Sequence, residues 1–464
     1  MKNRSIHAMM REELAAKILF EQAKKYAFEY IDEMPERMVF PAEGALQGLA
    51  QFDEPLPAAP HPAAEVLSQL HQYGSPATVA QTGGRYFGFV NGSIIPAALA
   101  ARWLSDTWDQ NAALHVTSPA ASKLEQICQQ WLVELFNLPA CTAAGLVGGT
   151  SIATFCGLAA ARYTILHRLG WDVNDQGLFD APKIRVVLSE QAHGTVYKAL
   201  SLLGIGRKSL EIVPADSQGR LDVTKLPELD ARTILLLQAG NVNSGAFDNF
   251  VEICQRANKA QAWVHIDGAF GLWAAASKAK SHLTRGIGSA DSWSVDGHKT
   301  LNTPYDCGVI LCKHPDALVS AMQATGSYIQ FSDYHDGMLY GPDMSRRARS
   351  VELWATLKYL GREGVEQLVD GLCARADQFA AELDQQGFRI LNDVVFNQVL
   401  VACDTAQQTQ AALENVQRSG VMWCGGTTWQ DEPAMRISVC SWATTEADVT
   451  MSVAALAKAR DSVR

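Results

Sequence analysis

Short apolar runs alternate with longer segments of helical spacing through the middle of the chain. The apolar runs cover residues 184–188, 233–240, 262–266, 292–295 and 309–312. Between two of them, residues 249–260 carry apolar positions at helical spacing. Strand–helix–strand alternation from 145 to 312 predicts a mostly parallel sheet with right-handed crossovers and helices on both faces. We therefore expect an α/β fold with its ligand site at the carboxyl ends of the strands.

The two ends of the chain follow other patterns. Residues 8–33 have helical spacing, and residues 34–64 contain six prolines and predict an extended connector. After residue 351, predicted helices at 354–360 and 364–386 alternate with short strands at 394–403 and 434–439, and a helix at 446–459 closes the chain. The pattern predicts an N-terminal arm at 1–84, a large domain at 85–350 and a small α+β domain at 351–464.

The N-terminal arm is either a peripheral decoration or a segment that covers another subunit. An apolar helix followed by a proline-rich strap cannot bury its apolar side chains alone, so we favour the second interpretation and predict a homodimer.

Composition excludes several classes of function. The chain has 464 residues with 48% hydrophobic and 19% charged residues, typical of a globular protein, and its net charge of −10 disfavours nucleic acids and anionic membranes as partners. No apolar run approaches membrane-spanning length, and the N-terminus lacks a signal-peptide pattern. The ten cysteines have no zinc-site spacing, so we expect no metal, reduced thiols and a cytoplasmic location.

The stretch from Asp291 to Cys312 contains the most informative lysine. Lys299 lies in the polar sequence GHKT between two apolar strands, where a lone lysine is usually only a solvated cation. Upstream, however, the buried strand 262–266 ends in Asp267. A lysine and a carboxylate at the same sheet indicate a cofactor that binds both. Lysine forms Schiff bases with pyridoxal phosphate, whose pyridinium nitrogen takes an acidic partner.

Two motifs resemble those of a known family. HIDGAF at 265–270 and ADSWSVDGHKTLNTPYDCG at 290–308 resemble the group II pyridoxal-phosphate-dependent amino acid decarboxylases, relatives of aromatic-L-amino-acid, glutamate and diaminobutyrate decarboxylases. The resemblance runs from about Pro60 to Val449. It implies a fold-type-I enzyme with a seven-stranded large-domain sheet, bound pyridoxal 5'-phosphate, and conversion of an L-amino acid to its amine and carbon dioxide. It also implies a dimer wrapped by the N-terminal arm.

The resemblance assigns roles to the residues around the cofactor. Lys299 would carry it covalently, Asp267 would pair with the ring nitrogen, and His193 would stack on the ring and orient the substrate carboxylate. His298 would contact phosphate or substrate. The remaining cofactor-binding candidates are Ala269 and Asn241, the latter standing where the family usually has threonine.

A glycine turn at 148–149 leads into an alanine-rich helix with Thr150 and Ser151 at its start. Such pairs are usually only turns, but free N–H groups and hydroxyls at a helix N-terminus bind phosphate. Where the family usually has a Ser-Gly-Gly-Ser run, this chain has Gly-Gly-Thr-Ser. We expect the cofactor phosphate at Thr150 and Ser151.

The substrate pocket departs from that of aromatic decarboxylases. The aromatic residues at 86–89 can be read simply as core residues, but the resemblance implies that Phe89 to Gly92, including Asn91, form the edge of the substrate pocket. Asn111 and Ala113 stand where those enzymes carry large apolar residues, so an aromatic substrate is in doubt. Arg436 lies in an apolar strand and needs an anion, which is either a structural carboxylate or that of the substrate.

Residues 325–350 predict a polar loop rich in tyrosine and glycine. The resemblance implies a mobile loop whose tyrosine, Tyr328 by alignment, closes over the site and helps protonate the product; a plain surface loop is the alternative. Three rival functions stay open: an aldehyde synthase, which Tyr328 disfavours; an aminotransferase or other lyase, which His298 disfavours; and a catalytically dead relative, which the joint presence of Lys299, Asp267 and His193 disfavours.

Overall fold

A seven-stranded sheet forms the centre of the protein. The computed structural model describes residues 5–323, 329 and 331–463. The strand order is β2-β8-β7-β6-β5-β3-β4; β8 is antiparallel to both neighbours and all other pairs are parallel. This arrangement confirms the predicted fold class. The strands are β2 (Ala143–Val147), β3 (Arg185–Ser189), β4 (Leu210–Val213), β5 (Thr233–Gln238), β6 (Trp263–Asp267), β7 (Ser292–Asp296) and β8 (Gly308–Cys312).

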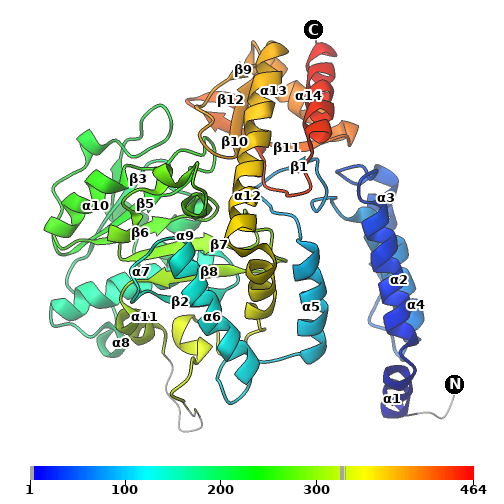
Figure 1. The fold of residues 1–464 in the computed structure, drawn as a ribbon, viewed down its shortest axis with the longest axis horizontal. Helices are drawn as coiled ribbons and strands as arrows, with labels where there is room; N and C mark the ends of the chain where they lie inside the picture. Colours follow the sequence, from blue (N-terminus) through cyan, green and yellow to red (C-terminus); the bar gives the residue numbers. More distant parts are fainter. Residues whose placement is uncertain (1–4, 324–328, 330, 464) are drawn as a thin grey trace.

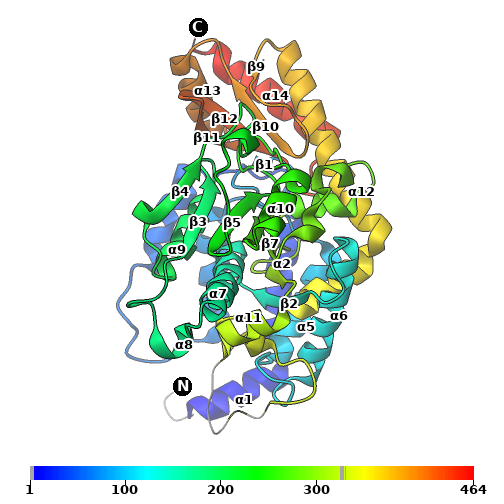
Figure 2. The same cartoon turned by 90° about the vertical axis from the view of Figure 1, so that its left-hand side faces the viewer.

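Helices cover both faces of this sheet, as Figures 1 and 2 show. Successive side chains of a strand point to opposite faces, so Leu235 and Leu237 pack into one core and Ile234 and Leu236 into the other. The first core is closed by α6 (Pro119–Leu135), α10 (Phe250–Lys259) and part of α12 (Ser350–Gln385). The second is closed by α7 (Thr150–Arg168), α9 (Gly194–Leu202) and α11 (Pro315–Met322). The short α8 (Val173–Gln176) follows α7.

A second, five-stranded sheet lies at the C-terminal end of the molecule (Figure 1). Its order is β1-β11-β12-β10-β9, and α12, α13 (Ala406–Ser419) and α14 (Glu446–Asp461) pack on its apolar face. The strands are β1 (Tyr86–Phe87), β9 (Arg389–Ile390), β10 (Gln398–Ala402), β11 (Trp423–Trp429) and β12 (Glu432–Ser438). Strand β1 comes from far upstream, after the domain boundary predicted at residue 84, and pairs in parallel with β11.

Helix α12 joins the two sheets and is interrupted at Gly361, where φ is +60°. Glycine adopts this left-handed conformation without steric cost, so one long segment becomes two helices that meet at an angle. The sequence pattern placed a break between residues 360 and 364, and the observed interruption confirms it.

The N-terminal arm lies beside the body of the molecule (Figure 1). It consists of α1 (Ile6–Ala16), α2 (Ile18–Glu33), α3 (Glu43–Gly48) and α4 (Ala63–Gln69), and α5 (Pro96–Trp108) follows at the start of the body. The predicted single helix at 8–33 is divided at Lys17, whose φ of +59° ends α1. No residue of α1 or α2 is buried.

Nine of the ten cysteines are buried, and the tenth, Cys141, is exposed. Within the described parts of the chain, no helix combines the length and the apolar character needed to cross a membrane.

Candidate active site

The lysine turn is the connection between β7 and β8, residues 297–307, and is longer than the tight turn predicted from the sequence. Lys299 Nζ lies 3.1 Å from Asp296 Oδ2 at the end of β7, and the Asp296 side chain is only 2% exposed. The same carboxylate accepts hydrogen bonds from the Thr150 N–H (2.7 Å) and hydroxyl (3.0 Å). Asp296 therefore connects the lysine to the start of α7.

Asp296 was missed by the sequence analysis. A signal was present: like Asp267 at the end of β6, it is an acidic residue that directly ends a buried apolar strand of the same sheet. Strands β6 and β7 are neighbours and parallel, so both carboxylates reach the same edge.

The glycine turn before α7 forms a cradle at the helix N-terminus. A side chain at Gly149 would come within 3.4 Å of His298 Cε1 and 3.6 Å of Asp296 Oδ1, so the glycine keeps this space open. Asp296 uses the Thr150 N–H, but among the described residues no partner engages the N–H or hydroxyl of Ser151. This first helical turn keeps donors available for an anion.

His298 is held in one tautomer. Its Nδ1 accepts the Cys307 N–H at 3.0 Å, which places the ring proton on Nε2, 3.5 Å from Asp296 Oδ2. Burial lowers the pKa of His298, so the ring is neutral near pH 7. The Tyr305 ring stacks on it with 4.3 Å between the ring centroids.

Asp267 is 7% exposed, and its Oδ1 accepts the Ala269 N–H at 3.2 Å. Within the described part of the chain it forms no ion pair. Burial raises its pKa, while the nearby charges of His193 and Lys299 act in the opposite direction. The Ala269 carbonyl in turn accepts the Asp296 N–H at 2.9 Å, which links the ends of β6 and β7.

His193 caps the start of α9, beyond the end of β3. Its Nδ1 lies 2.7 Å from Thr195 Oγ1. The residue is exposed, yet the surrounding protein partly desolvates the ring, and this desolvation lowers the pKa of His193. The positive charges of Lys299 and Arg436 lower it further, and Asp267 raises it. The structure thus brings together His193 from the start of α9, Asp267 from the end of β6 and Lys299 from the β7–β8 connection.

The small domain contributes Arg436 to this cluster. Arg436 lies on β12, and burial lowers its pKa. Its closest polar contact is 3.5 Å, from a terminal guanidinium nitrogen to Asn243 Oδ1. Its Nε is buried without a hydrogen-bond partner, and no carboxylate pairs with it within the described residues. The structural-carboxylate alternative therefore finds no support among these residues.

Asn241 organises the loop after β5. Its Oδ1 accepts the N–H groups of Asn243 (2.9 Å) and Ser244 (3.2 Å), while its Nδ2 is buried without a partner among the described residues. Asn243 also accepts the Thr427 hydroxyl at 3.0 Å, so this loop contacts the small sheet beside Arg436.

The predicted pocket edge reaches the lysine turn. Asn91 Oδ1 accepts the Tyr305 hydroxyl at 2.9 Å, and its Nδ2 donates to Gln81 Oε1 at 3.1 Å. Both ends of the Asn91 amide are therefore bonded within the protein. Phe89, 61% exposed, stacks on Trp423 of β11 with 5.5 Å between centroids.

Asn111 has a different position. Its Oδ1 accepts the Arg346 N–H at 3.1 Å, and no contact between it and the Lys299 cluster is found within the described part of this chain. Ala113 is buried in a small apolar group with Leu114 and Met338.

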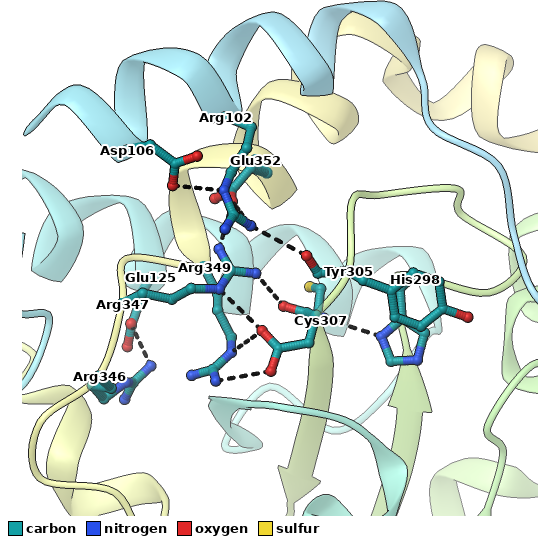
Figure 3. A network of polar contacts seen from close by, with 11 residues as sticks. Arg102, Asp106, Glu125, His298, Tyr305, Cys307, Arg346, Arg347, Arg349 and Glu352 are labelled. Carbon is teal, nitrogen blue, oxygen red and sulfur yellow. Dashed lines mark hydrogen bonds and ion pairs between the residues drawn. The ribbon is translucent and has the colours of Figure 1, made fainter. Parts of the chain in front are cut away.

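A charged network lies behind the cradle (Figure 3). Asp306 accepts hydrogen bonds from Arg347 (3.0 Å) and Arg349 (3.1 Å), and its carboxylate would touch any side chain added at Gly148. The buried Glu352 pairs with Arg347 and with Arg102 of α5. Because these charges pair with one another, Arg347 and Arg349 belong to a scaffold rather than to a free cationic surface.

Comparison with known proteins identifies the family. Residues 46–402 match the model of the pyridoxal-dependent decarboxylase conserved domain. The chain belongs to the pyridoxal-dependent decarboxylase family. It is 30% identical over 377 residues to the aromatic-L-amino-acid decarboxylase of Drosophila lebanonensis, covering 75% of this chain and 91% of that protein. It is 27% identical to the 4-hydroxyphenylacetaldehyde synthase of Rhodiola rosea, covering 55% of this chain and 53% of that one.

The fold comparison agrees. The structure of Oryza sativa TDC with PLP and tryptamine superposes with a TM-score of 0.89 at 19% identity, covering 97% of this chain and 98% of that one. This protein is therefore a pyridoxal-phosphate-dependent decarboxylase with a fold-type-I architecture.

The residues at the strand ends fit this cofactor. Asp267 is a buried carboxylate with no ion pair in the described part of the decarboxylase, as a pyridinium nitrogen requires. Lys299 supplies an amine, and the start of α7 supplies free donors for a phosphate.

Tyr328 lies outside the described residues, so its role stays a prediction. Two other loop tyrosines are engaged in ring stacks: Tyr334 with His115, at 4.0 Å between centroids, and Tyr340 with His335, at 4.7 Å. The Asp336 carboxylate further fixes this end of the loop by accepting the His115 N–H at 2.7 Å.

Proposed function

We propose that this decarboxylase converts an L-amino acid to the corresponding amine and carbon dioxide at the cluster of Lys299, His193 and Asp267. The observation that carries the proposal is the buried carboxylate of Asp267, without an ion pair among the described residues, beside the Lys299 amine and His193, whose pKa is lowered by burial. Three such groups at the carboxyl edge of one sheet are typical of an active site rather than of a structural ion network.

In this proposal Lys299 holds pyridoxal phosphate covalently. Thr150, Ser151 and the Nε2–H of His298 bind its phosphate, His193 lies against its ring, and Asn241 and Ala269 complete the surroundings. The Asp267 carboxylate keeps a proton at the ring nitrogen because an adjacent negative charge favours the protonated form. Bound in this way, the cofactor supplies an acceptor for the electron pair of the broken bond to the carboxylate.

The chain's own residues would orient the substrate. Arg436, whose Nε has no partner among the described residues, and His193 are available to a substrate carboxylate. A guanidinium binds a carboxylate through paired hydrogen bonds. Phe89 and Asn91 would border the side-chain pocket. We propose that Asn111 borders the pocket of a second subunit, because its contacts in its own chain lie with Arg346.

Two measurements test this function. Borohydride reduction of the enzyme with bound cofactor, followed by peptide mapping, should place the label on Lys299 and give no label in Lys299→Ala. A panel of L-amino acids should then show carbon dioxide release with an equal amount of amine for at least one of them. A label on another lysine contradicts the site, and no carbon dioxide from any amino acid contradicts the reaction.

An aldehyde synthase is the second candidate, since a relative carries that name. Tyr328 favours amine formation because a phenol has a proton to deliver to the α-carbon. The stacked Tyr334 and Tyr340 are already engaged, which supports Tyr328 as the donor. Tyr328→Phe should still release carbon dioxide, with aldehyde and ammonia rising at the expense of amine.

The matched controls are Tyr334→Phe and Tyr340→Phe, which should leave the amine yield unchanged. If either control, and not Tyr328→Phe, shifts the product, the alignment along the loop is wrong. If none of the three does, the loop carries no catalytic proton donor.

We also propose a cytoplasmic homodimer. Helices α1 and α2 expose apolar side chains along their length, which favours a partner surface; they include Met10, Leu14, Ile18, Phe20, Phe28 and Ile31. Light scattering should give twice the chain mass, and deletion of residues 1–64 should reduce solubility. A stable, active monomer would contradict the proposal.

A further inference from the structure

Asn302, three residues after Lys299, is fully buried. Its φ of +58° lies in the left-handed region, which asparagine tolerates better than most residues. The side-chain Nδ2 of Asn302 donates to the carbonyls of Lys299 (3.1 Å) and Thr300 (2.8 Å). The backbone N–H of Asn302 also donates to the Lys299 carbonyl, at 2.9 Å. Two backbone carbonyls of the lysine turn are thus bonded to one side-chain amide, that of Asn302.

The same amide bonds two other parts of the molecule. Its Nδ2 lies 2.9 Å from the carbonyl of Cys440, and its Oδ1 accepts the N–H groups of Ser93 (2.9 Å) and Trp442 (3.0 Å). Ser93 follows the pocket edge at Asn91. Cys440 and Trp442 follow β12, the strand that carries Arg436. One side chain therefore contacts the lysine turn, the pocket edge and the small domain.

Neighbouring backbone contacts confine this junction. The Gly92 N–H donates to the His298 carbonyl at 3.2 Å, and a side chain at Gly92 would collide with the carbonyl of Lys299. The Ile95 N–H donates to the Asn302 carbonyl at 3.0 Å. With such close packing, the three segments have little freedom to adjust if the central amide is changed.

We propose that Asn302 is a positioning residue: its side chain holds the backbone of Lys299 in place relative to Arg436 and the pocket edge. This inference rests on the proposed function. An amide is suited to the task because it offers donors and acceptors together, whereas a carboxylate offers only acceptors. Misplacing a reacting group by about 1 Å can cost up to about 10²-fold in rate.

The test compares Asn302→Asp with Asn397→Asp. Asn397 is the matched control: it is equally buried and donates to the carbonyl of Val439, one residue before Cys440, but no contact with the lysine turn is found for it in the described chain. Each enzyme is measured with bound cofactor and well below its own unfolding midpoint. Asn302→Asp should lower kcat by about 10- to 100-fold, with a smaller change in KM, and should slow the covalent capture of added pyridoxal phosphate. Asn397→Asp should change both rates by less than about twofold.

If Asn302→Asp does not fold, Asn302→Gly replaces it, because glycine adopts the observed φ without strain. A folded Asn302 variant with wild-type kcat and capture rate overturns the proposal, as does an equal loss in Asn397→Asp. Failure of the proposed function itself is distinguishable, since the borohydride label would then map away from Lys299 in the wild-type enzyme.

Discussion

The two ends of the active site differ in how their polar groups are partnered. At the proposed phosphate end, Asp296 bonds to Thr150 and Lys299, and His298 bonds to the backbone of Cys307. At the proposed substrate end, the buried Nε of Arg436 has no partner among the described residues. Buried polar groups are rarely left unpaired, so the first end is a preorganised scaffold and the second is where a ligand completes the hydrogen bonding.

The largest expected effect is at Asp267, which forms no ion pair among the described residues. Asp267→Asn should retain the cofactor but lower kcat by on the order of 10²–10³-fold, because an amide cannot hold a proton at the ring nitrogen as a carboxylate does. Steady-state kinetics with the best substrate of the panel measures this, and absorbance confirms that cofactor is bound. Unchanged turnover would show that Asp267 is structural.

A second change acts on the substrate end. Arg436→Gln should raise KM by about 10- to 100-fold, since a charged hydrogen bond to the substrate carboxylate is lost. Arg436→Lys should recover only part of that loss, because it keeps the charge and not the paired geometry. The dissociation constant of pyridoxal phosphate should be the same in both variants as in the wild type. Much weaker cofactor binding with an unchanged KM would show that Arg436 binds the cofactor phosphate rather than the substrate.

A smaller effect is expected at Asp296, where the substitution should strengthen binding instead of weakening it. A carboxylate beside a bound phosphate repels it, so Asp296→Asn should tighten pyridoxal phosphate binding by about fivefold, or roughly 1 kcal/mol. Fluorescence titration of the apoenzyme measures this constant. Ser151→Ala is the control, which removes a free hydroxyl without changing charge and should weaken binding. Weaker binding in Asp296→Asn would mean that the carboxylate organises the cradle more than it repels phosphate.

A further effect concerns the stability of the protein beneath the site. His265, fully buried against Ser292 on β7, has its pKa lowered by burial to about 3. As the pH falls below about 6.5, the unfolded chain binds a proton at His265 before the folded protein does. The free energy of unfolding therefore decreases between about pH 6.5 and about pH 3, by up to about 1.4 kcal/mol per pH unit. In urea unfolding, the free energy of unfolding of His265→Asn should fall less steeply with decreasing pH than that of the wild type. His314→Asn, at a half-exposed site, is the control, and an equally steep fall for all three proteins would contradict the assignment.

What the sequence predicted was local. The alternation of apolar runs gave the order of strands and helices, and the polar residues after each strand gave Lys299, Asp267 and His193, because the ends of parallel strands meet at one edge. Asp296 was missed since its role depends on packing against α7, which no local pattern reveals. Strand β11 was missed because Gly425 and Gly426 interrupt its apolar alternation. The pairing of β1 with β11 joins segments more than three hundred residues apart, and periodicity carries no information about such contacts.

That pairing also bears on attempts to redesign the enzyme. The β1 segment continues directly into Phe89 and Asn91, and Trp423 of β11 stacks between Tyr86 and Phe89. Gly88 has no room for a side chain because the Trp423 ring occupies that space. A pocket edge transplanted from a relative would therefore meet a foreign surface unless β11 were exchanged with it. The natural unit of exchange for altering substrate preference is the pair of strands, although they lie at opposite ends of the gene.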